Sequence, residues 1–264
     1  MTERAEPGED MALSLRDITV RFGGVCALDH VSIDVPKGSV SGLIGPNGAG
    51  KSTLLAVASG LQPVDTGRIL VDTEDLTGAR PQRFARARMS RTFQAPQLVP
   101  EIDVRQHILL GLRSFRSQGW NAKAGALVRG ITRSELDRAE RLLAELGLSE
   151  VARRSPMELP LGLRRLVEVA QCIATDPRIL LLDEPSAGLN RVETQAFAAI
   201  VSRLSAERGI AVLLVEHDMD LVLEISEQLF VLDFGELIAS GATEDVTKDQ
   251  RVRDAYLGTV KEGA

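Results

Sequence analysis

The sequence is poor in the residues that build disulfide frameworks and metal sites. Among 264 residues there are two cysteines and three histidines. Cys26 and Cys172 are too few for a disulfide framework, and each lies in an apolar stretch, so we expect buried, reduced thiols. His30, His107 and His217 have no ligand spacing with the cysteines, which argues against a structural zinc site.

Long hydrophobic runs are also missing. The longest apolar runs, such as residues 210–215, are far shorter than the roughly 18 residues of a membrane-spanning helix. Residues 1–10 are polar and acidic, unlike a signal peptide. We therefore expect a cytoplasmic protein that reaches a membrane only through a partner.

Basic residues are in deficit and aromatic residues are few. The net charge is −6, from 31 basic and 37 acidic residues, and only nine residues are Trp, Tyr or Phe. This balance argues against broad binding to nucleic acid or anionic lipid. Hydrophobic residues make up 44% and charged residues 26%, as in ordinary globular proteins, and the length allows one large domain or two small ones.

Strand patterns occupy both ends of the chain, and helical patterns occupy the middle. Strands are predicted at 13–20, 25–35, 39–44 and 67–71, with a helix over 51–59. From about 81 to 159 the sequence is Arg-rich and helical, with a capping-box pattern at 132–135. Beyond Gly162, helices alternate with apolar strands at 179–182 and 210–215, and a hairpin turns near Phe234. These patterns predict an α/β core with an inserted helical subdomain.

A glycine-rich loop between the strand at 39–44 and the next helix fits the pattern G-x-x-x-x-G-K-[ST]. Its glycines let backbone N–H groups surround phosphate oxygens, and the helix N-terminus adds a favourable dipole. Lys51 can reach the β- and γ-phosphates and Ser52 can bind Mg²⁺. The predicted nucleotide-binding loop consists of Gly45, Pro46, Asn47, Gly48, Ala49, Gly50, Lys51, Ser52 and Thr53.

Two acids follow the apolar strand at 179–182. Asp183 at the strand end could hold Mg²⁺ through water, and Glu184 on the loop could orient or deprotonate the attacking water. Apolar strands often end in acids, so this feature gains its weight from the phosphate-binding loop.

Three further segments, together with these motifs, resemble the ATP-binding subunits of ABC transporters over nearly the whole chain: Arg91-Thr92-Phe93-Gln94, Ser186 to Asn190, and His217 after the strand at 210–215. The resemblance implies that Gln94 contacts metal and water and senses the membrane partner. It also implies that His217 bonds the γ-phosphate and that residues 186–190 form a dimer contact. Phe22 takes the place of the aromatic that stacks on adenine, although a plain core role is the alternative.

Within that family the chain most resembles the ATPases of branched-chain (hydrophobic) amino-acid importers, although urea and other importers share the pattern. The resemblance is carried by Arg21 to Gly24, Asn190 in place of Asp, Glu216 to Met219, and Ala255 to Gly258.

The family's Leu-Ser-Gly-Gly-Gln signature is altered here. Proline replaces the serine whose hydroxyl would bond a γ-phosphate held by the opposite subunit. Either this is family drift, because proline suits a helix start, or it weakens a composite site; both interpretations stay open. The signature, acting in trans, would be Leu159, Pro160, Leu161, Gly162 and Leu163.

The resemblance predicts a single α/β domain over 1–264, with a P-loop NTPase core and parallel sheet, an N-terminal antiparallel β subdomain and an inserted helical subdomain. Residues 1–10 would be a disordered tail, 11–80 and 163–264 the nucleotide-binding core, and 81–162 the helical subdomain with the signature.

The predicted function is ATP hydrolysis, with ATP and Mg²⁺, coupled to solute import and above all to branched-chain amino acids. Expected partners are a related but different second ATPase, two permease subunits and, indirectly, an extracytoplasmic solute-binding protein. No nucleic acid is expected, and the site of action would be the cytoplasmic face of the plasma membrane. The alternatives are a lipid or glycan exporter, and a soluble ATPase acting on nucleic acid or ribosomes. The soluble class is disfavoured because the chain has one cassette and no sustained heptads.

Overall fold

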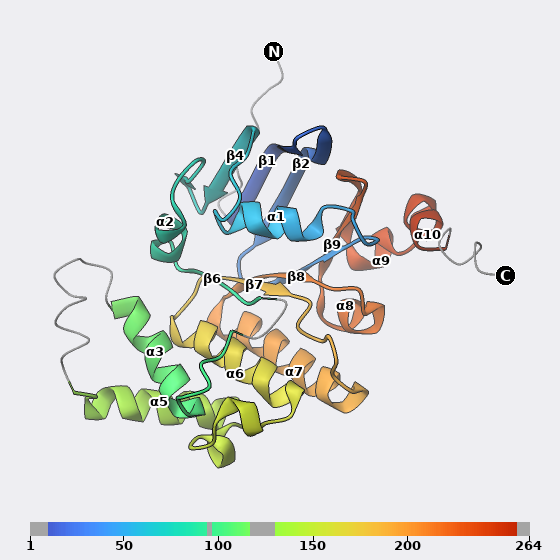
Figure 1. The fold of residues 1–264 in the computed structure, drawn as a ribbon. Coiled ribbons are helices and arrows are strands. Elements are labelled where there is room, and N and C mark those ends of the chain that lie inside the picture. The colour runs from blue at the N-terminus through green and yellow to red at the C-terminus, as the bar shows by residue number, and fades with distance from the viewer. Residues whose placement is uncertain (1–9, 94–96, 117–129, 258–264) are drawn as a thin grey trace.

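Two β-sheets with helices between and around them make up the fold (Figure 1). The computed structural model describes residues 10–93, 97–116 and 130–257, so Gln94 lies outside the described residues. The strands are β1 (Met11–Phe22), β2 (Val25–Pro36), β3 (Val40–Ile44), β4 (Thr66–Val71), β5 (Glu74–Asp75), β6 (Met89–Arg91), β7 (Ile179–Asp183), β8 (Ala211–Val215), β9 (Gln228–Asp233) and β10 (Glu236–Ala242). The helices are α1 (Lys51–Ala58), α2 (Pro81–Arg86), α3 (Val104–Arg116), α5 (Arg133–Glu145), α6 (Leu161–Ala174), α7 (Arg191–Arg208), α8 (Met219–Ile225), α9 (Thr243–Val246) and α10 (Gln250–Leu257), with 3₁₀ turns η1 (Ser149–Val151) and η2 (Pro156–Glu158).

The N-terminal strands form an antiparallel sheet in the order β2-β1-β4-β5. The β1–β2 hairpin pairs Phe22 with Val25 across its tip, where Gly23 adopts a φ of 59°. This is the antiparallel β subdomain that the sequence predicts.

The larger sheet has the order β10-β9-β3-β8-β7-β6. Its strands are parallel except β10, which runs antiparallel to β9. Every residue of β3, β7 and β8 is buried, as expected for apolar strands with both faces covered. The predicted α/β class is confirmed.

Alternate side chains of these strands enter different cores. Leu181 and Leu213 pack with α1 and the antiparallel sheet, so α1 lies between the two sheets (Figure 1). Leu180 and Leu182 pack instead with α3, α5, α6 and α7 on the opposite face. A third cluster joins β9 to α8, α9 and α10. The period of two in an extended chain therefore divides each strand between two apolar layers.

The segment expected to be wholly helical contains one strand. Met89–Arg91 forms β6, which pairs in parallel with β7 at the edge of the large sheet. Three residues are too few to show an alternating pattern, and their extended conformation is fixed by pairing with β7 rather than by local preference. β6 places the residues that follow it beside the end of β7.

The helical subdomain packs on the core through α6. Helix α5 begins with the predicted capping box, in which Thr132 and Glu135 each accept a hydrogen bond from the other's backbone. Helices α3 and α6 cross closely at Gly111, where a Cβ atom would lie 2.4 Å from the Gln171 carbonyl oxygen and 2.7 Å from the Ala174 Cβ. The crossing therefore requires a residue without a side chain.

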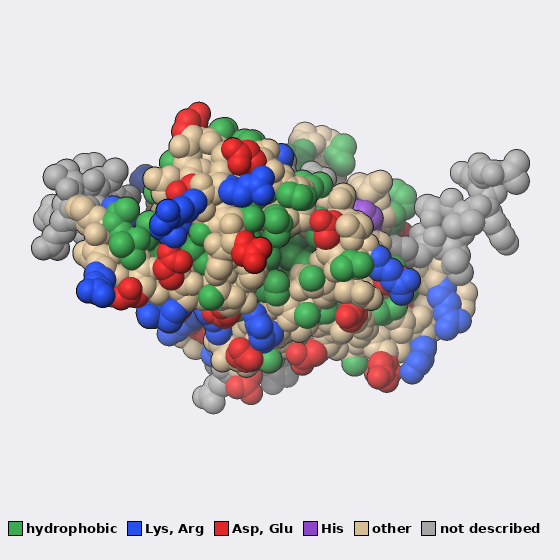
Figure 2. All heavy atoms as spheres, turned by 90° about the horizontal axis from the view of Figure 1, so that it is seen from below, with side chains coloured by type: hydrophobic (Ala, Val, Ile, Leu, Met, Phe, Trp, Pro, Cys, Tyr) green, Lys and Arg blue, Asp and Glu red, His purple; other side chains and the backbone are tan. Residues whose placement is uncertain are grey.

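The face on the side of this subdomain is mixed in charge. Among the described residues it shows acidic and basic side chains interspersed, with hydrophobic side chains gathered near its middle (Figure 2). No continuous stripe of one sign runs across the described part of this face.

Substituting Gly111→Ala is expected to destabilise the protein by about 1–3 kcal/mol, because the new methyl group overpacks the α3–α6 contact. The loss should occur although alanine favours a helix over glycine by about 1 kcal/mol. Urea denaturation followed by circular dichroism measures the change. Gly24→Ala is the matched control, because nothing lies within 4 Å of a Cβ there and its φ is not positive. Equal midpoints for Gly111→Ala and Gly24→Ala would contradict the close-packing argument.

Candidate functional site

The phosphate-binding loop leaves the carboxyl end of β3 and enters α1. Gly45 and Gly50 have φ values of 155° and 100°. A Cβ at Gly45 would lie 2.2 Å from the Leu232 carbonyl oxygen, and one at Gly50 would lie 2.5 Å from the Ala27 carbonyl oxygen. Among the described residues, no side chain caps the first turn of α1. Its N–H groups are therefore available to an anion.

Lys51 begins α1 and is 7% exposed. Its Nζ atom donates to the carbonyl oxygens of Gly45 at 2.7 Å and Pro46 at 2.9 Å. Burial lowers the pKa of the Lys51 ammonium, and the carboxylates of Glu184 and Asp183 oppose that shift. The ammonium thus folds back against its own loop, where bound phosphate could compete for it.

A cavity of about 440 Å³ opens over this loop. One wall comes from the start of β2, another from the turn between β9 and β10, and a third from Glu184. Its lining is Val25, Cys26, Ala27, Asn47, Gly48, Ala49, Gly50, Lys51, Ser52, Thr53, Glu184 and Phe234. Most of the predicted loop therefore faces one cavity at the carboxyl edge of the parallel sheet, where ligands bind in open α/β folds.

Asp183 ends β7 as a buried carboxylate. Arg91 donates from Nη2 to Asp183 Oδ2 at 2.9 Å and from Nη1 to Ser59 Oγ at 3.1 Å. The backbone N–H of Asp183 donates to Thr92 Oγ1 at 3.2 Å. These contacts fix the carboxylate, and the sequence motif gave no sign of the role of Arg91.

Glu184 lies next to the predicted histidine. Its φ is 45°, a left-handed value that a small share of non-glycine residues adopt. Its Oε1 atom is 4.0 Å from His217 Nδ1, and its N–H donates to the Val215 carbonyl at 2.9 Å. The two predicted catalytic side chains are therefore adjacent.

Glu216 is a buried carboxylate for which the sequence suggested no role of its own. Its side chain has no exposed surface and accepts hydrogen bonds from the N–H groups of Ser186 at 2.8 Å and His217 at 3.2 Å. Glu216 thus fixes the start of the loop over residues 186–190 and the backbone of His217. An acid directly after a buried strand is the signal that could have indicated it.

Gln94 lies outside the described residues, but the residue before it is held on both sides. The Phe93 N–H donates to Glu168 Oε1 at 3.0 Å, and Arg165 Nη1 donates to the Phe93 carbonyl at 2.9 Å. Burial raises the pKa of Glu168, against the lowering effect of the Phe93 N–H and the Arg165 charge. This buried pair fixes the entry to Gln94 against α6.

The predicted signature surrounds the start of α6. Leu159 is buried, Pro160 occupies the N-cap position, and Leu161 is its first helical residue and exposed. A Cβ at Gly162 would lie 2.8 Å from Glu193 Oε1. Leu163 is partly buried against the helical core, and none of the five signature residues lines the described cavity over the phosphate-binding loop. The P-loop cavity within one chain therefore lacks this motif.

Phe22 ends β1 at the hairpin tip, half exposed. It is not among the residues that line the described P-loop cavity, but its cross-strand partner Val25 is. Stacking of Phe22 on adenine stays a prediction.

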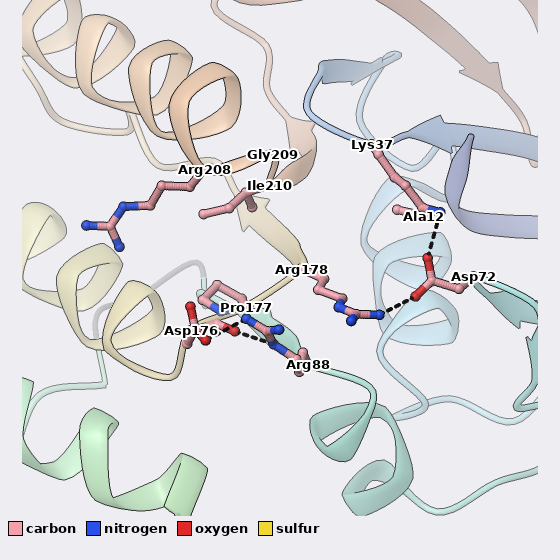
Figure 3. A pocket seen from close by; sticks show the side chains of 10 residues that line it. All are labelled: Ala12, Lys37, Asp72, Arg88, Asp176, Pro177, Arg178, Arg208, Gly209 and Ile210. Atoms are coloured by element: carbon pink, nitrogen blue, oxygen red, sulfur yellow. Dashed lines mark hydrogen bonds and ion pairs between the residues drawn. The ribbon is translucent and has the colours of Figure 1, made fainter. Parts of the chain in front are cut away.

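A second cavity of about 400 Å³ lies near the starts of β7 and β8, at the opposite edge of the sheet (Figure 3). Asp72 bridges Lys37 at 3.2 Å and Arg178 at 3.0 Å, and Arg88 pairs with Asp176 at 2.6 Å. These basic side chains thus have carboxylate partners, and the cavity holds none of the predicted site residues.

Both cysteines are free, but they are only partly buried rather than fully buried as expected. Cys26 lines the P-loop cavity. Cys172 lies on α6, where its surroundings raise the thiol pKa to about 12 through desolvation and the nearby Glu168 charge.

Sequence comparison finds similarity to transport ATP-binding proteins. The family profile described as ABC transporter matches residues 28–187, and that described as branched-chain amino acid ATP-binding cassette transporter matches residues 236–262. The chain is 37% identical to the high-affinity branched-chain amino acid transport ATP-binding protein BraF of Pseudomonas aeruginosa, over 93% of this chain and 97% of the relative. It is 36% identical to LivG of Escherichia coli, a protein of the same description, over the same shares.

Structural comparison gives the same result. A crystal structure of the ADP conformation of an ATP-binding cassette of an ABC transporter superposes with a TM-score of 0.83 at 33% identity, covering 94% of this chain and 99% of that one. A nucleotide-free cassette superposes with a TM-score of 0.82 at 33% identity, covering 93% and 98%.

MgATP is expected to slow the alkylation of Cys26 by iodoacetamide at pH 8, because this thiol lines the P-loop cavity. Cys172 is the internal control: a thiol with a pKa of about 12 is ionised in about one molecule in 10⁴ at pH 8 and should react little in either condition. Peptide mass spectrometry over a time course reads both sites. A Cys26 rate unaffected by saturating MgATP would contradict the placement of nucleotide in this cavity.

Proposed function

The chain belongs to the ABC transporter family of branched-chain amino acid transport ATP-binding proteins, and from this premise we propose that it is the ATP-hydrolysing subunit of a branched-chain amino acid importer. It is an ABC ATPase, in which ATP hydrolysis is coupled to transport. The site is assigned on one observation: Lys51 and Glu184 line the same cavity at the start of α1.

We infer that the triphosphate binds in the loop over Gly45 to Thr53. Lys51 would leave its carbonyl partners to contact the β- and γ-phosphates, and the N–H groups of the first turn of α1 would bind phosphate oxygens. Glu184 would orient or deprotonate the attacking water, with His217 beside it bonding the γ-phosphate. The place of Glu184 in the cavity lining, with its carboxylate 4.0 Å from His217 Nδ1, supports this role.

The residues present fit a magnesium ion. Ser52 offers an exposed hydroxyl in the first turn of α1, and Asp183 offers a buried carboxylate fixed by Arg91. Mg²⁺ is bound in such sites by one or two protein oxygens, substrate phosphates and water. The ion would neutralise phosphate charge, while Ser52 and, through water, Asp183 would hold it; Gln94 is proposed to add a further contact.

We propose that the signature residues 159–163 act in trans, because they do not line the chain's own described cavity. The N-cap position of Pro160 means that the start of α6 can still face a phosphate, but without a hydroxyl. A related second ATPase with an intact signature would complete the site of this chain. Pairing this chain with that subunit would give two sites with unequal hydrolysis rates.

Permease subunits are the other proposed partners. No helix in the described ranges is long and apolar enough to cross a membrane. We propose that two permease subunits hold the ATPase at the cytoplasmic face of the plasma membrane and dock on the helical insert between Gln94 and Glu158. A solute-binding protein would act indirectly. The hydrogen bonds of Phe93 with Glu168 and Arg165 support docking on this insert, because they attach the residue that precedes Gln94 to helix α6.

Glu184→Gln is expected to lower ATP turnover by a factor on the order of 10² or more, because the amide keeps size and some hydrogen bonding but cannot act as a base. ATP binding should persist and the closed dimer should accumulate. ATPase rates and sedimentation velocity, measured together on the assembled transporter, test both points. Glu207→Gln, an exposed carboxylate near the end of α7, controls for loss of a carboxylate outside the cavity and away from the start of α6. Wild-type turnover in Glu184→Gln would remove Glu184 from this role.

Pro160→Ser is expected to raise turnover of the chain assayed alone, because the restored hydroxyl adds a hydrogen bond to a charged phosphate, worth about 1.5–3 kcal/mol. In the reconstituted heteromeric transporter, the substitution should change the rate at only one of the two sites. Steady-state ATPase assays of both forms measure this. A purified chain that is as fast alone as the full transporter, with no effect of Pro160→Ser on either, would contradict the proposed pairing.

A further inference from the structure

Phe234 is the most exposed large hydrophobic side chain in the described residues, at 88%. It lies in the turn between β9 and β10 with a φ of 43°, a left-handed conformation that disfavours an aromatic residue. Neither the exposed ring nor the backbone conformation stabilises the free chain. The exposed ring is free to contact a ligand, and its place beside the cavity over the phosphate-binding loop makes it a candidate for binding.

The turn is fixed to the phosphate-binding loop. The Gly235 N–H donates to the Ala49 carbonyl at 3.1 Å, and the Gly235 carbonyl accepts from the Asp29 N–H at 2.9 Å. A Cβ at Gly235 would lie 2.9 Å from the Ala27 carbonyl oxygen, so the turn packs directly on β2. The position of the Phe234 backbone is therefore tied to the same loop that holds Lys51.

Phe234 lines the same cavity as the phosphate-binding loop. Lys51 and the start of α1 account for the phosphate part of a nucleotide. The apolar part of the lining comes from Phe234 and from Val25, Cys26 and Ala27 on β2. A nucleotide likewise has a charged part, the triphosphate, and a flat base whose faces stack on aromatic rings.

We propose that Phe234 packs against the nucleobase of the bound nucleotide, in the part of the cavity that it lines together with Val25, Cys26 and Ala27 of β2. The inference rests on the proposed binding of triphosphate at Lys51. Every base has a π-face, so a stacking contact discriminates poorly between bases. Loss of the ring should thus weaken ATP and GTP to a similar degree.

The test compares ATP, GTP and inorganic tripolyphosphate by isothermal titration on the purified chain. Phe234→Asn removes the ring but keeps a residue that tolerates left-handed φ. It should weaken ATP and GTP by a factor on the order of ten, the size of one base–aromatic stack, and leave tripolyphosphate unchanged. Phe234→Tyr should restore nucleotide affinity to within about twofold, because it keeps the ring.

Two controls separate the contributions. Leu61→Ala removes an exposed hydrophobic side chain that does not line the cavity and should bind all three ligands as the wild type does. Lys51→Ala should weaken tripolyphosphate as well as ATP. If Lys51→Ala binds both normally, the proposed phosphate site is wrong, whatever Phe234 does.

Three results would overturn the role of Phe234. Unchanged ATP affinity in Phe234→Asn would show that the ring contacts another protein or solvent. An equal loss of ATP and tripolyphosphate affinity would show that the turn only supports the phosphate-binding loop. A urea midpoint for Phe234→Asn below that of the wild type would show that the ring stabilises the fold, whereas relief of the left-handed strain predicts an equal or higher midpoint.

Discussion

The close approach of backbone segments around the phosphate-binding loop is the constraint on which the rest of the structure depends. Gly45 lies against the carbonyl of Leu232, and Gly50 lies against the carbonyl of Ala27, so side chains at either position would separate the segments. Gly235 then joins the same loop to β2 and to the turn after β9. The antiparallel sheet, the parallel sheet and α1 are thereby fixed around one cavity, which is why residues from four parts of the chain line it.

Near the edge of this cavity, two ion pairs hold side chains and backbone in place rather than adding to the stability of the fold. Removing charges from water costs several kcal/mol for each ion, so a buried ion pair is weak evidence for a stabilising role. Arg91 with Asp183, and Arg165 with Glu168, nevertheless lie buried on either side of the segment that leads to Gln94. The first pair orients the carboxylate at the end of β7, and the second fixes the backbone of Phe93 to α6. Together they connect the edge of the sheet at the proposed catalytic site with the helix at whose start the predicted signature lies.

The proposed nucleotide site lacks the predicted signature residues within a single chain. The described cavity presents Lys51 and Glu184, while Leu161 at the start of α6 packs instead with Gly188 of the loop after Glu184. The starts of α6 and α7 thus form a common surface, since Gly162 also approaches Glu193. In a head-to-tail pair this surface would face the partner's cavity. A change at Pro160 would then affect the nucleotide site formed by the partner's phosphate-binding loop.

The sequence by itself determined the features that depend on neighbouring residues. Glycine spacing between an apolar strand and a helix located the loop around Lys51, and the apolar run that ends in an acid located Asp183 at the edge of the sheet.

The tertiary structure alone decided the contacts between distant segments. Arg91 reaches Asp183 across 92 positions, Phe93 reaches Glu168 across 75, and β6 is extended because β7 lies beside it. Phe234 likewise belongs to the cavity only because the turn after β9 packs on the loop before α1. Local patterns encode helices, strands and loops through short-range sterics and hydrogen bonding, whereas these pairings arise from the packing of whole elements and leave no periodic signal in the chain.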